Sequence, residues 1–180
     1  VSNATNHCTS VATLTVLENK LLPIAQASAP QAITCKNLSV ELDGAGSDAG
    51  NDVTYLWTTA NGHILSGKNT LAPTVNQAGL YTLLITNSLN GCTNTAAATV
   101  LLDQTTPFAQ ISPAKQLSCT VVNIQLDGLG SSNAPGLLYL WSASAGGNIV
   151  SGGNSLTPLV NAPGQYGLLI TDPANGCTAQ

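Results

Sequence analysis

The chain contains the same sequence unit twice, and part of it a third time. Cys35 recurs as Cys119, 84 residues later, and Cys8 recurs as Cys92 and again as Cys177. A period this long is the size of a small domain, so it predicts a tandem array of domains rather than a helical solenoid. Shared stretches include Leu-Asp-Gly at 42–44 and 126–128, Tyr-Leu-Trp at 55–57 and 139–141, and Leu-Leu-Ile-Thr at 83–86 and 168–171.

The register of the repeat predicts three segments. Residues 1–20 correspond to the last strand of a preceding repeat, residues 21–104 form the first full repeat, and residues 105–180 form a second repeat that lacks its last strand. Ala12–Leu17 aligns with Ala96–Leu101, which is the strand that the second repeat lacks. Two explanations stay open: a window onto a longer array, or a strand supplied by a neighbouring chain. We favour the window, because residues 1–11 would duplicate residues 170–180.

The composition excludes several classes of partner. Only 7% of the residues are charged, compared with about a quarter in typical domains, and the net charge is -4 without any arginine. This charge gives no basic surface for nucleic acid. No apolar run approaches the roughly 18 residues of a membrane span, so we expect no membrane insertion. Because such a surface repels itself only weakly, side-by-side association of copies costs little.

The five cysteines recur with the repeat and form no C-x-x-C pair, a pattern typical of disulfides. We predict one bridge in each repeat, Cys35 with Cys92 and Cys119 with Cys177. Each bridge would close a loop of nearly sixty residues and stabilise its domain by up to about 4 kcal/mol. Cys8 then has no partner in this chain. Disulfides indicate an oxidising compartment, here extracellular or at a bacterial cell surface.

Short alternating apolar runs separated by Gly, Asn, Asp and Pro predict an all-β fold. About seven strands in roughly eighty residues favour an immunoglobulin-like β-sandwich for each repeat. In the first repeat the expected strands are 24–27, 38–42, 54–58, 63–65, 71–75, 80–86 and 96–102.

Alternation along these strands also predicts the core. The inward residues are Leu38, Val40, Leu42, Tyr55, Trp57, Tyr81, Leu83 and Ile85, and in the second repeat Val122, Ile124, Leu126, Tyr139, Trp141, Tyr166, Leu168 and Ile170.

The order of motifs in each repeat resembles a known family. Leu-Asp-Gly-x-Gly-Ser, then Tyr-x-Trp, then Gly-x-Tyr-x-Leu-x-Ile-Thr and a closing Asn-Gly-Cys-Thr is similar to the PKD and Ig-like repeats of large bacterial surface proteins. Such repeats are typical of adhesins and of cargo of the type IX secretion system. The resemblance implies a β-sandwich spacer or adhesive module without catalysis. The chain departs from it after Tyr-x-Trp, where the acidic run usual in PKD domains is replaced by Thr58–Gly62.

We expect no metal, cofactor or catalytic group. Asp43, Asp48 and Asp52 share one loop and could suggest calcium, which takes roughly six to eight oxygen ligands. The second repeat keeps only Asp127 of the three, whereas a site used by the array should recur. No nucleophile, base and acid are arranged for hydrolysis.

A repeated set of leucines has no place in the predicted core. These residues lie between inward positions, so alternation puts them on the outer face of one sheet, as a candidate surface for self-association. Single exposed leucines are also ordinary in soluble domains, and this alternative stays open. The candidate surface comprises Leu56, Leu84, Leu101, Leu140 and Leu169.

The sequence therefore predicts a structural repeat of an extracellular bacterial fibre, stalk or filament, with neighbouring repeats or copies as its partners. The alternative is an Ig-like adhesin module whose loops bind glycan or protein on other cell surfaces. The loops vary between the two repeats and are poor in aromatic residues, which favours the structural role.

Overall fold

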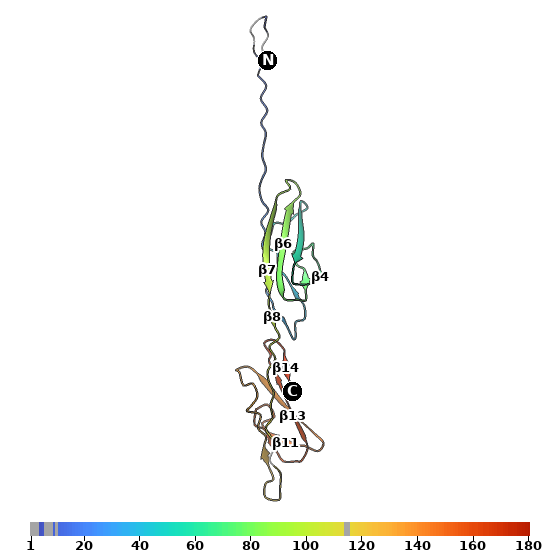
Figure 1. Ribbon diagram of the computed structural model, residues 1–180, viewed down its shortest axis with the longest axis vertical. Helices are drawn as coiled ribbons and strands as arrows, with labels where there is room; N and C mark the ends of the chain where they lie inside the picture. Colours follow the sequence, from blue (N-terminus) through green and yellow to red (C-terminus); the bar gives the residue numbers. More distant parts are fainter. Residues whose placement is uncertain (1–3, 6–8, 10, 114–115) are drawn as a thin grey trace.

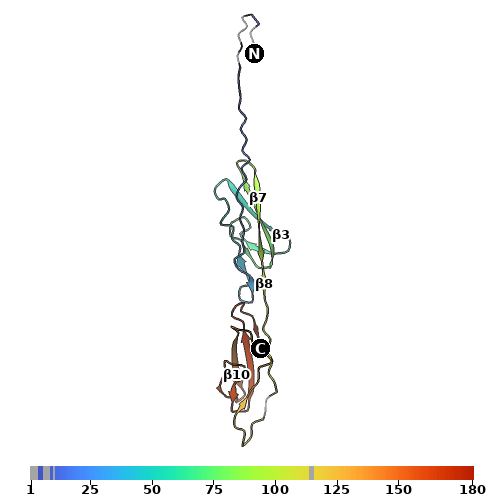
Figure 2. The same ribbon diagram turned by 90° about the vertical axis from the view of Figure 1, so that its left-hand side faces the viewer.

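The computed structural model describes residues 4–5, 9, 11–113 and 116–180. These residues form strands, turns and extended segments, with no helix among them. Figures 1 and 2 show two β-modules placed end to end, with the N-terminal segment leading away along the same axis. Each module has its own hydrophobic core, one built from residues between 25 and 100 and the other from residues between 109 and 170. The boundaries at 20 and 104 stay predictions, and the prediction for Cys8 falls outside the described residues.

The first module is a sandwich of two three-stranded antiparallel sheets. One sheet has the order β2-β5-β4 and the other β3-β6-β7. A short parallel pair, β1 with β8, closes the end that faces the second module. The strands are β1 (Ile33–Thr34), β2 (Val40–Glu41), β3 (Val53–Thr59), β4 (Ile64–Ser66), β5 (Thr74–Val75), β6 (Gly79–Asn87), β7 (Thr93–Val100) and β8 (Leu102–Asp103).

The second module repeats this topology in shorter form. Its sheets have the orders β11-β12-β9 and β10-β13-β14. Its last strand, β14, pairs with β13 at two positions only, whereas β7 pairs with β6 at eight. The strands are β9 (Ile124–Gln125), β10 (Leu138–Ser144), β11 (Ile149–Ser151), β12 (Leu159–Val160), β13 (Gln165–Thr171) and β14 (Thr178–Ala179). The fold is thus all-β and immunoglobulin-like, as predicted.

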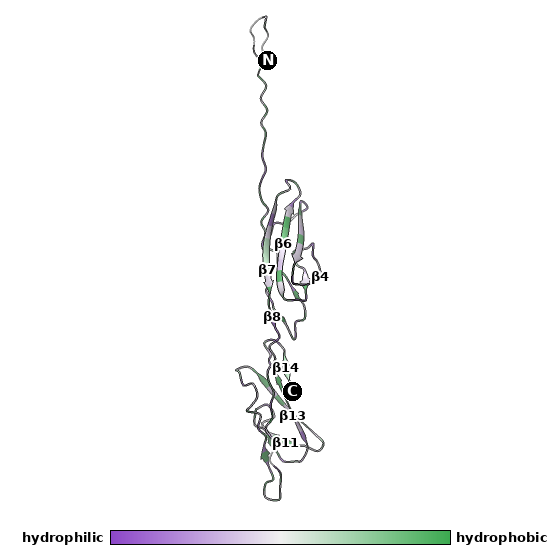
Figure 3. Cartoon of the chain, viewed as in Figure 1, coloured by the Kyte–Doolittle hydropathy of each residue, from purple (hydrophilic) through white to green (hydrophobic). Residues whose placement is uncertain are grey.

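Alternating residues of the long strands form the two cores, as the sequence predicts, and Figure 3 shows the apolar stretches of β6 and β13. Tyr81, Leu83 and Ile85 of β6 are fully buried. The prediction is wrong for Leu38 and its counterpart Val122, whose side chains are 67% and 62% exposed. Their segment turns instead of extending: the backbone N–H of Asn37 donates to the Thr34 hydroxyl at 2.9 Å, and strand pairing begins only at Val40.

Equivalent residues of the two modules make equivalent hydrogen bonds at the edges of the cores. The indole N–H of Trp57 donates to the carbonyl of Thr70 at 2.9 Å, and that of Trp141 donates to the carbonyl of Ser155 at 2.7 Å. The hydroxyl of Tyr81 donates to the carbonyl of Gln77 at 2.6 Å. No buried side-chain nitrogen or oxygen of the described residues lacks a partner. The polar ends of the aromatic side chains are therefore satisfied and fix the turns around each core.

One predicted strand is replaced by side-chain bonding. Residues 24–27 form no strand, because the Ser47 hydroxyl accepts from the N–H of Gln26 and donates to its carbonyl, at 2.9 and 3.0 Å. These two bonds satisfy the backbone of Gln26 without a neighbouring strand. The chain then forms β1, which was not predicted, close to the second module.

Candidate assembly surfaces

The joint between the modules contains a disulfide that the sequence did not predict. Cys35, directly after β1, is bonded to Cys177, which lies at the end of the turn between β13 and β14 of the second module. Within the described residues Cys92 and Cys119 are free. The predicted pairs Cys35–Cys92 and Cys119–Cys177, with one bridge inside each domain, are therefore wrong. The bond joins two modules instead.

The length of β7 explains why Cys35 does not bond to Cys92. Ile33 of β1 pairs with Leu102 of β8, whereas Cys92 lies ten residues before Leu102, at the far end of β7. At about 3.3 Å per residue, ten extended residues span roughly 33 Å. A disulfide requires Cα atoms within about 7 Å. Cys35 therefore lies at the opposite end of its own module from Cys92, and next to the corresponding turn of the next module.

Asn175 holds the turn of the second module against the linker between the modules. Its amide donates to the Asp103 carboxylate and to the carbonyl of Thr105, both at 3.0 Å. Its side-chain oxygen accepts from the backbone N–H of Cys177 at 2.9 Å. Asn175 is 2% exposed and Cys177 is 1% exposed. The asparagine thus orients the cysteine that forms the bond.

Lys36 covers the same turn from the side of the first module. Its backbone N–H donates to the carbonyl of Asn175 at 3.2 Å, and its ammonium donates to the carbonyl of Pro173 at 3.0 Å. A Cβ added to Gly176 would lie 2.7 Å from the Cβ of Lys36, and Gly176 has a φ of 76°. The close approach and the left-handed backbone both require glycine at this position.

The joint also contains a carboxyl group, that of Asp103, whose pKa is lowered. Hydrogen bonds from the Asn175 amide and from the backbone N–H of Thr105 favour the charged form of Asp103 and lower its pKa below the ordinary value. Asp103 is exposed, so solvent screens this interaction.

The first module carries the same turn, and no second module among the described residues covers it. The Asn90 amide donates to the Asn19 side-chain oxygen at 3.2 Å and to the carbonyl of Leu21 at 3.0 Å, and its oxygen accepts from the N–H of Cys92 at 2.9 Å. Asn19 and Leu21 correspond to Asp103 and Thr105. We call Asn90–Cys92 the first turn and Asn175–Cys177 the second turn.

The outer face of the long sheet carries part of the predicted leucine surface. Leu56 lies directly opposite Leu84 in the pairing of β3 with β6, and Leu140 lies opposite Leu169 in the pairing of β10 with β13. Leu56 and Leu140 are 39% and 55% exposed, whereas Leu84 and Leu169 are half-buried.

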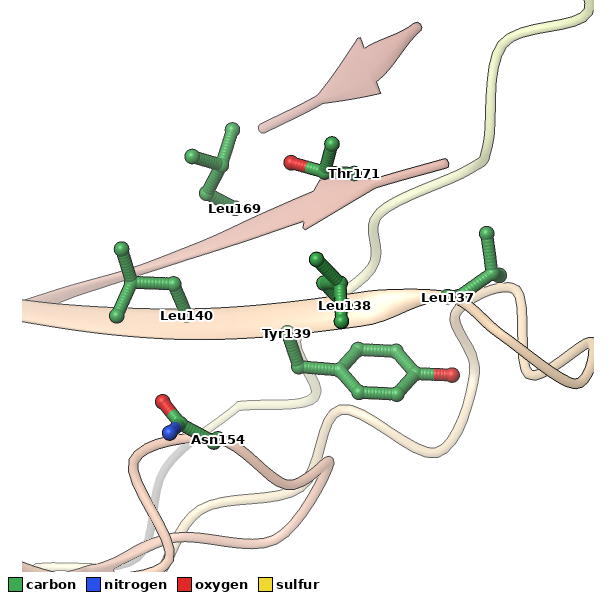
Figure 4. A pocket seen from close by; sticks show the side chains of 7 residues that line it. All are labelled: Leu137, Leu138, Tyr139, Leu140, Asn154, Leu169 and Thr171. Atoms are coloured by element: carbon green, nitrogen blue, oxygen red, sulfur yellow. The ribbon is translucent and has the colours of Figure 1, made fainter. Parts of the chain in front are cut away.

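Figure 4 shows the leucines of the second module beside a shallow pocket of about 360 Å³. Leu138 and Leu140 lie on one side of β10, and Tyr139 lies on the other. Leu138 pairs with Thr171, is 59% exposed and extends this surface. The sequence reasoning missed it, although alternation with Leu140 gives the signal. Its counterpart in the first module is Thr54, so the two outer faces differ.

Leu101 does not belong to this surface. Leu84 pairs with Thr95 of β7, and Leu101 lies six residues further along the chain, or roughly 20 Å at the usual rise of a strand. Leu101 is 66% exposed, and its carbonyl accepts from the N–H of Ile33. It therefore belongs to the joint end of the module.

The acidic loop of the first module is tied into its own backbone. One Asp43 oxygen accepts from the N–H of Ala45 at 2.8 Å, and one Asp48 oxygen accepts from the N–H of Ile24 at 2.9 Å. No group of three or more His, Cys, Asp or Glu residues that could hold a metal ion occurs among the described residues. The loop thus orders the start of the module through caps and turns.

Comparisons with known proteins were made for sequence and for structure. No protein-family model matches the chain. No curated protein matches it either. The described part of the chain has no helix with the length and apolarity to cross a membrane.

The comparison with solved structures found several matches. Extracellular domains 3–5 of Drosophila OTK are 11% identical, with a TM-score of 0.34, and the match covers 89% of this chain and 60% of that one. Titin domains z1z2, in a complex with telethonin, are 14% identical, with a TM-score of 0.32 and coverage of 90% and 95%. The BSP domain of a biofilm-associated protein is 14% identical, with a TM-score of 0.28 and coverage of 88% and 28%.

Proposed function

We propose that this chain is a structural repeat of an extracellular fibre, stalk or filament. One observation carries the proposal: the disulfide Cys35–Cys177 joins consecutive modules rather than the strands of one module. Each joint then has two covalent connections, the linker near Asp103 and the disulfide. Two connections restrict hinge motion between modules and keep the chain extended, as a fibre or stalk requires.

The chemistry of the chain supports an extracellular location. Disulfides persist in oxidising compartments and are rare in the cytosol. The finer assignment, a PKD-like repeat of a bacterial surface protein related to type IX cargo, is supported by the order of the sequence motifs. We propose no catalytic role.

Imaging of native material tests this function. Electron microscopy with an antibody against the folded chain should label continuous fibres or stalks whose axial repeat matches one module. Label on isolated short rods, or on dispersed protein bound to glycan-coated surfaces, would contradict the structural role and favour the adhesin alternative.

We also propose that the outer leucines support side-by-side packing of fibres. Each leucine that becomes fully buried contributes roughly 1.5–3 kcal/mol, and the repeat multiplies this contact along the fibre. Changing Leu56, Leu84, Leu140 and Leu169 to Ser should leave both modules folded and reduce bundling, followed by light scattering.

The matched control for this variant is Leu101→Ser. It removes an exposed leucine that lies away from the outer face, so bundling should persist. Equal bundling by the fourfold variant and by the control would exclude this surface as the lateral contact.

A further inference from the structure

The first turn has the structure of half a joint. Asn90 already holds the preceding linker and the N–H of Cys92 through the same three hydrogen bonds that Asn175 makes in the joint. The difference is what covers the turn. Lys36 packs against Gly176, whereas no described atom beyond the two neighbouring residues lies within 4 Å of a Cβ built on Gly91. Cys92 is free and half-exposed.

The second module carries the complementary half. Cys119 corresponds to Cys35 and is a free, exposed thiol. In the first module the residue two positions earlier, Ile33, is 4% exposed because β8 pairs beside it. Its counterpart Leu117 is only half-buried, and it borders an open pocket of about 420 Å³ together with Ile124, Val160 and Tyr166.

A strand that would fill this space lies at the other end of the molecule. Ala12–Leu17 is extended and aligns with residues 96–101. Val100 is 2% exposed in the first module, whereas its counterpart Val16 is 87% exposed. On the second module, no strand of the described residues pairs with β13 between Gln165 and Leu169 on the side where β14 lies.

We propose that copies of this chain join head to tail, through a joint that reproduces the one between their own modules. Ala12–Leu17 of one copy pairs with β13 of a second copy and places Val16 in its open pocket. Thr120 of the second copy then covers Gly91 in the way that Lys36 covers Gly176. Cys119 of the second copy bonds to Cys92 of the first. The inference rests on the proposed structural role and takes the second of the two explanations left open by the sequence, in which a neighbouring chain supplies the missing strand.

The covalent step needs an oxidant of the disulfide class, such as oxidised glutathione. The Cys92 thiolate attacks one sulfur of that disulfide and releases one thiolate. The Cys119 thiolate of the other copy then attacks the mixed disulfide and releases the second. Two cysteine thiols lose two protons and two electrons, and the low-molecular-weight disulfide is reduced to two thiols.

The register of the repeat supports this pairing. Cys35 and Cys177 belong to consecutive modules, and Cys119 and Cys92 are their counterparts in the repeat. Joining the second module of one copy to the first module of another puts these two cysteines in the relation that Cys35 and Cys177 have. The strand supplies backbone pairing at the same joint, which is the chemistry of β-strand addition.

A mixing experiment on the full chain tests the proposal. All proteins carry Cys8→Ser, and they are incubated in reduced and oxidised glutathione, then alkylated and run on a non-reducing gel. The chain with Cys92 and Cys119 intact should form a ladder of linked copies. Cys92→Ser alone and Cys119→Ser alone should stay monomeric, and their mixture should give a dimer at least about tenfold above either one. Mass spectrometry should identify a Cys92–Cys119 peptide.

The strand contact has its own matched pair of variants. Val16→Lys places a charge at the position that enters the pocket, and Thr15→Lys places the same charge on the outward side, as at the exposed Thr99. Val16→Lys should slow linking by about tenfold or more, while Thr15→Lys leaves it nearly unchanged. Both changes lie in a segment exposed in the monomer, so folding is preserved.

Three results would overturn the proposal. They are no linked species in the mixture, Cys92–Cys92 and Cys119–Cys119 bonds in amounts equal to the Cys92–Cys119 bond, or equal effects of the two lysine variants on linking. Each of them leaves the structural role testable by imaging, because fibres could then form without this bond. Fibres absent from native material, with the bond still formed in the mixture, would contradict the structural role and leave the chemistry of the joint intact.

Discussion

The two modules have nearly the same core but differ at their ends. Trp57 and Trp141 occupy equivalent buried positions and make equivalent hydrogen bonds. Tyr81, however, is completely buried, whereas Tyr166 is half-buried and borders an open pocket. In the first module the full length of β7 covers the edge of β6, and β8 closes the end of the sandwich. The core is thus specified by each repeat, while closure depends on the segment leading to the next one.

The two turns show the same dependence. Asn90 and Asn175 make the same three kinds of hydrogen bond, yet only the second turn is covered by a neighbouring module and bonded through its cysteine. The local fold of the turn therefore does not require the joint. The turn is held by the hydrogen bonds of its own asparagine, whether or not a second module covers it.

Removing the bond between the modules should have the largest effect on stability. Closing a loop of more than 100 residues contributes up to about 5 kcal/mol by limiting the entropy of the unfolded chain. The double variant Cys35→Ser with Cys177→Ser should lose up to that amount, measured by urea unfolding of the dilute protein.

The control for this variant is Cys92→Ser with Cys119→Ser. These thiols are unbonded in the monomer, so the free energy of unfolding should change by less than about 0.5 kcal/mol. Similar losses of unfolding free energy in the two double variants would mean that the bond at the joint stabilises the chain no more than the two free thiols do.

The asparagines of the two turns give the next largest effect. Asn175→Ala removes the bonds to the buried N–H of Cys177, to the carbonyl of Thr105 and to the Asp103 carboxylate, at a cost of about 2 kcal/mol. The Asp103 carboxylate keeps its bond from the Thr105 N–H. Asn90→Ala removes the same bonds in a more exposed place, where water replaces them, and should cost about half as much, roughly 1 kcal/mol. Unfolding followed by the fluorescence of Trp57 and Trp141, one in each module, measures both. A larger loss from Asn90→Ala would contradict the view that coverage by the joint sets the difference.

Local patterns explain what could be predicted from the sequence. The alternation around Tyr81, Leu83 and Ile85 predicted their burial, because burial on one face of a strand depends on neighbours two residues apart. The repeat also predicted that both modules share one topology. The predicted burial of Leu38 is wrong because the Thr34 hydroxyl accepts a bond from the N–H of Asn37 and turns the chain there. Alternation of apolar residues does not encode such a turn.

The joint could not be predicted from local patterns. Cys35 and Cys92 are separated in sequence by a distance that suits a bridge inside one domain, and only the direction of β7 puts them at opposite ends. One signal was present in the sequence. Cys92 follows the Asn-Gly turn and stands at the start of β7, whereas β1, which precedes Cys35, pairs with β8 beyond the end of β7. Leu101 was assigned to the outer surface for the same reason, since alternation gives the side of a strand but not the position along the sheet.

The smallest expected effect is a pH dependence of the second turn alone. The pKa of Asp103 is lowered by the hydrogen bonds from Asn175 and Thr105, so the unfolded chain binds more protons than the folded one between that pKa and the ordinary value near 3.8. The stabilisation is therefore present above pH 3.8 and is lost as the pH falls through the folded pKa. The first turn has the neutral Asn19 at this position and should show no such change.

The comparison of Asp103→Asn with the unchanged chain isolates this effect from the other carboxyl groups. The difference between their melting temperatures should be constant above about pH 4.5 and should shrink as the pH falls below 3.8. Because Asp103 is exposed, the change should also weaken in high salt. A difference that stays constant down to pH 2 would mean that the Asn175 amide is held by Thr105 alone, and that the charge at residue 103 does not distinguish the two turns.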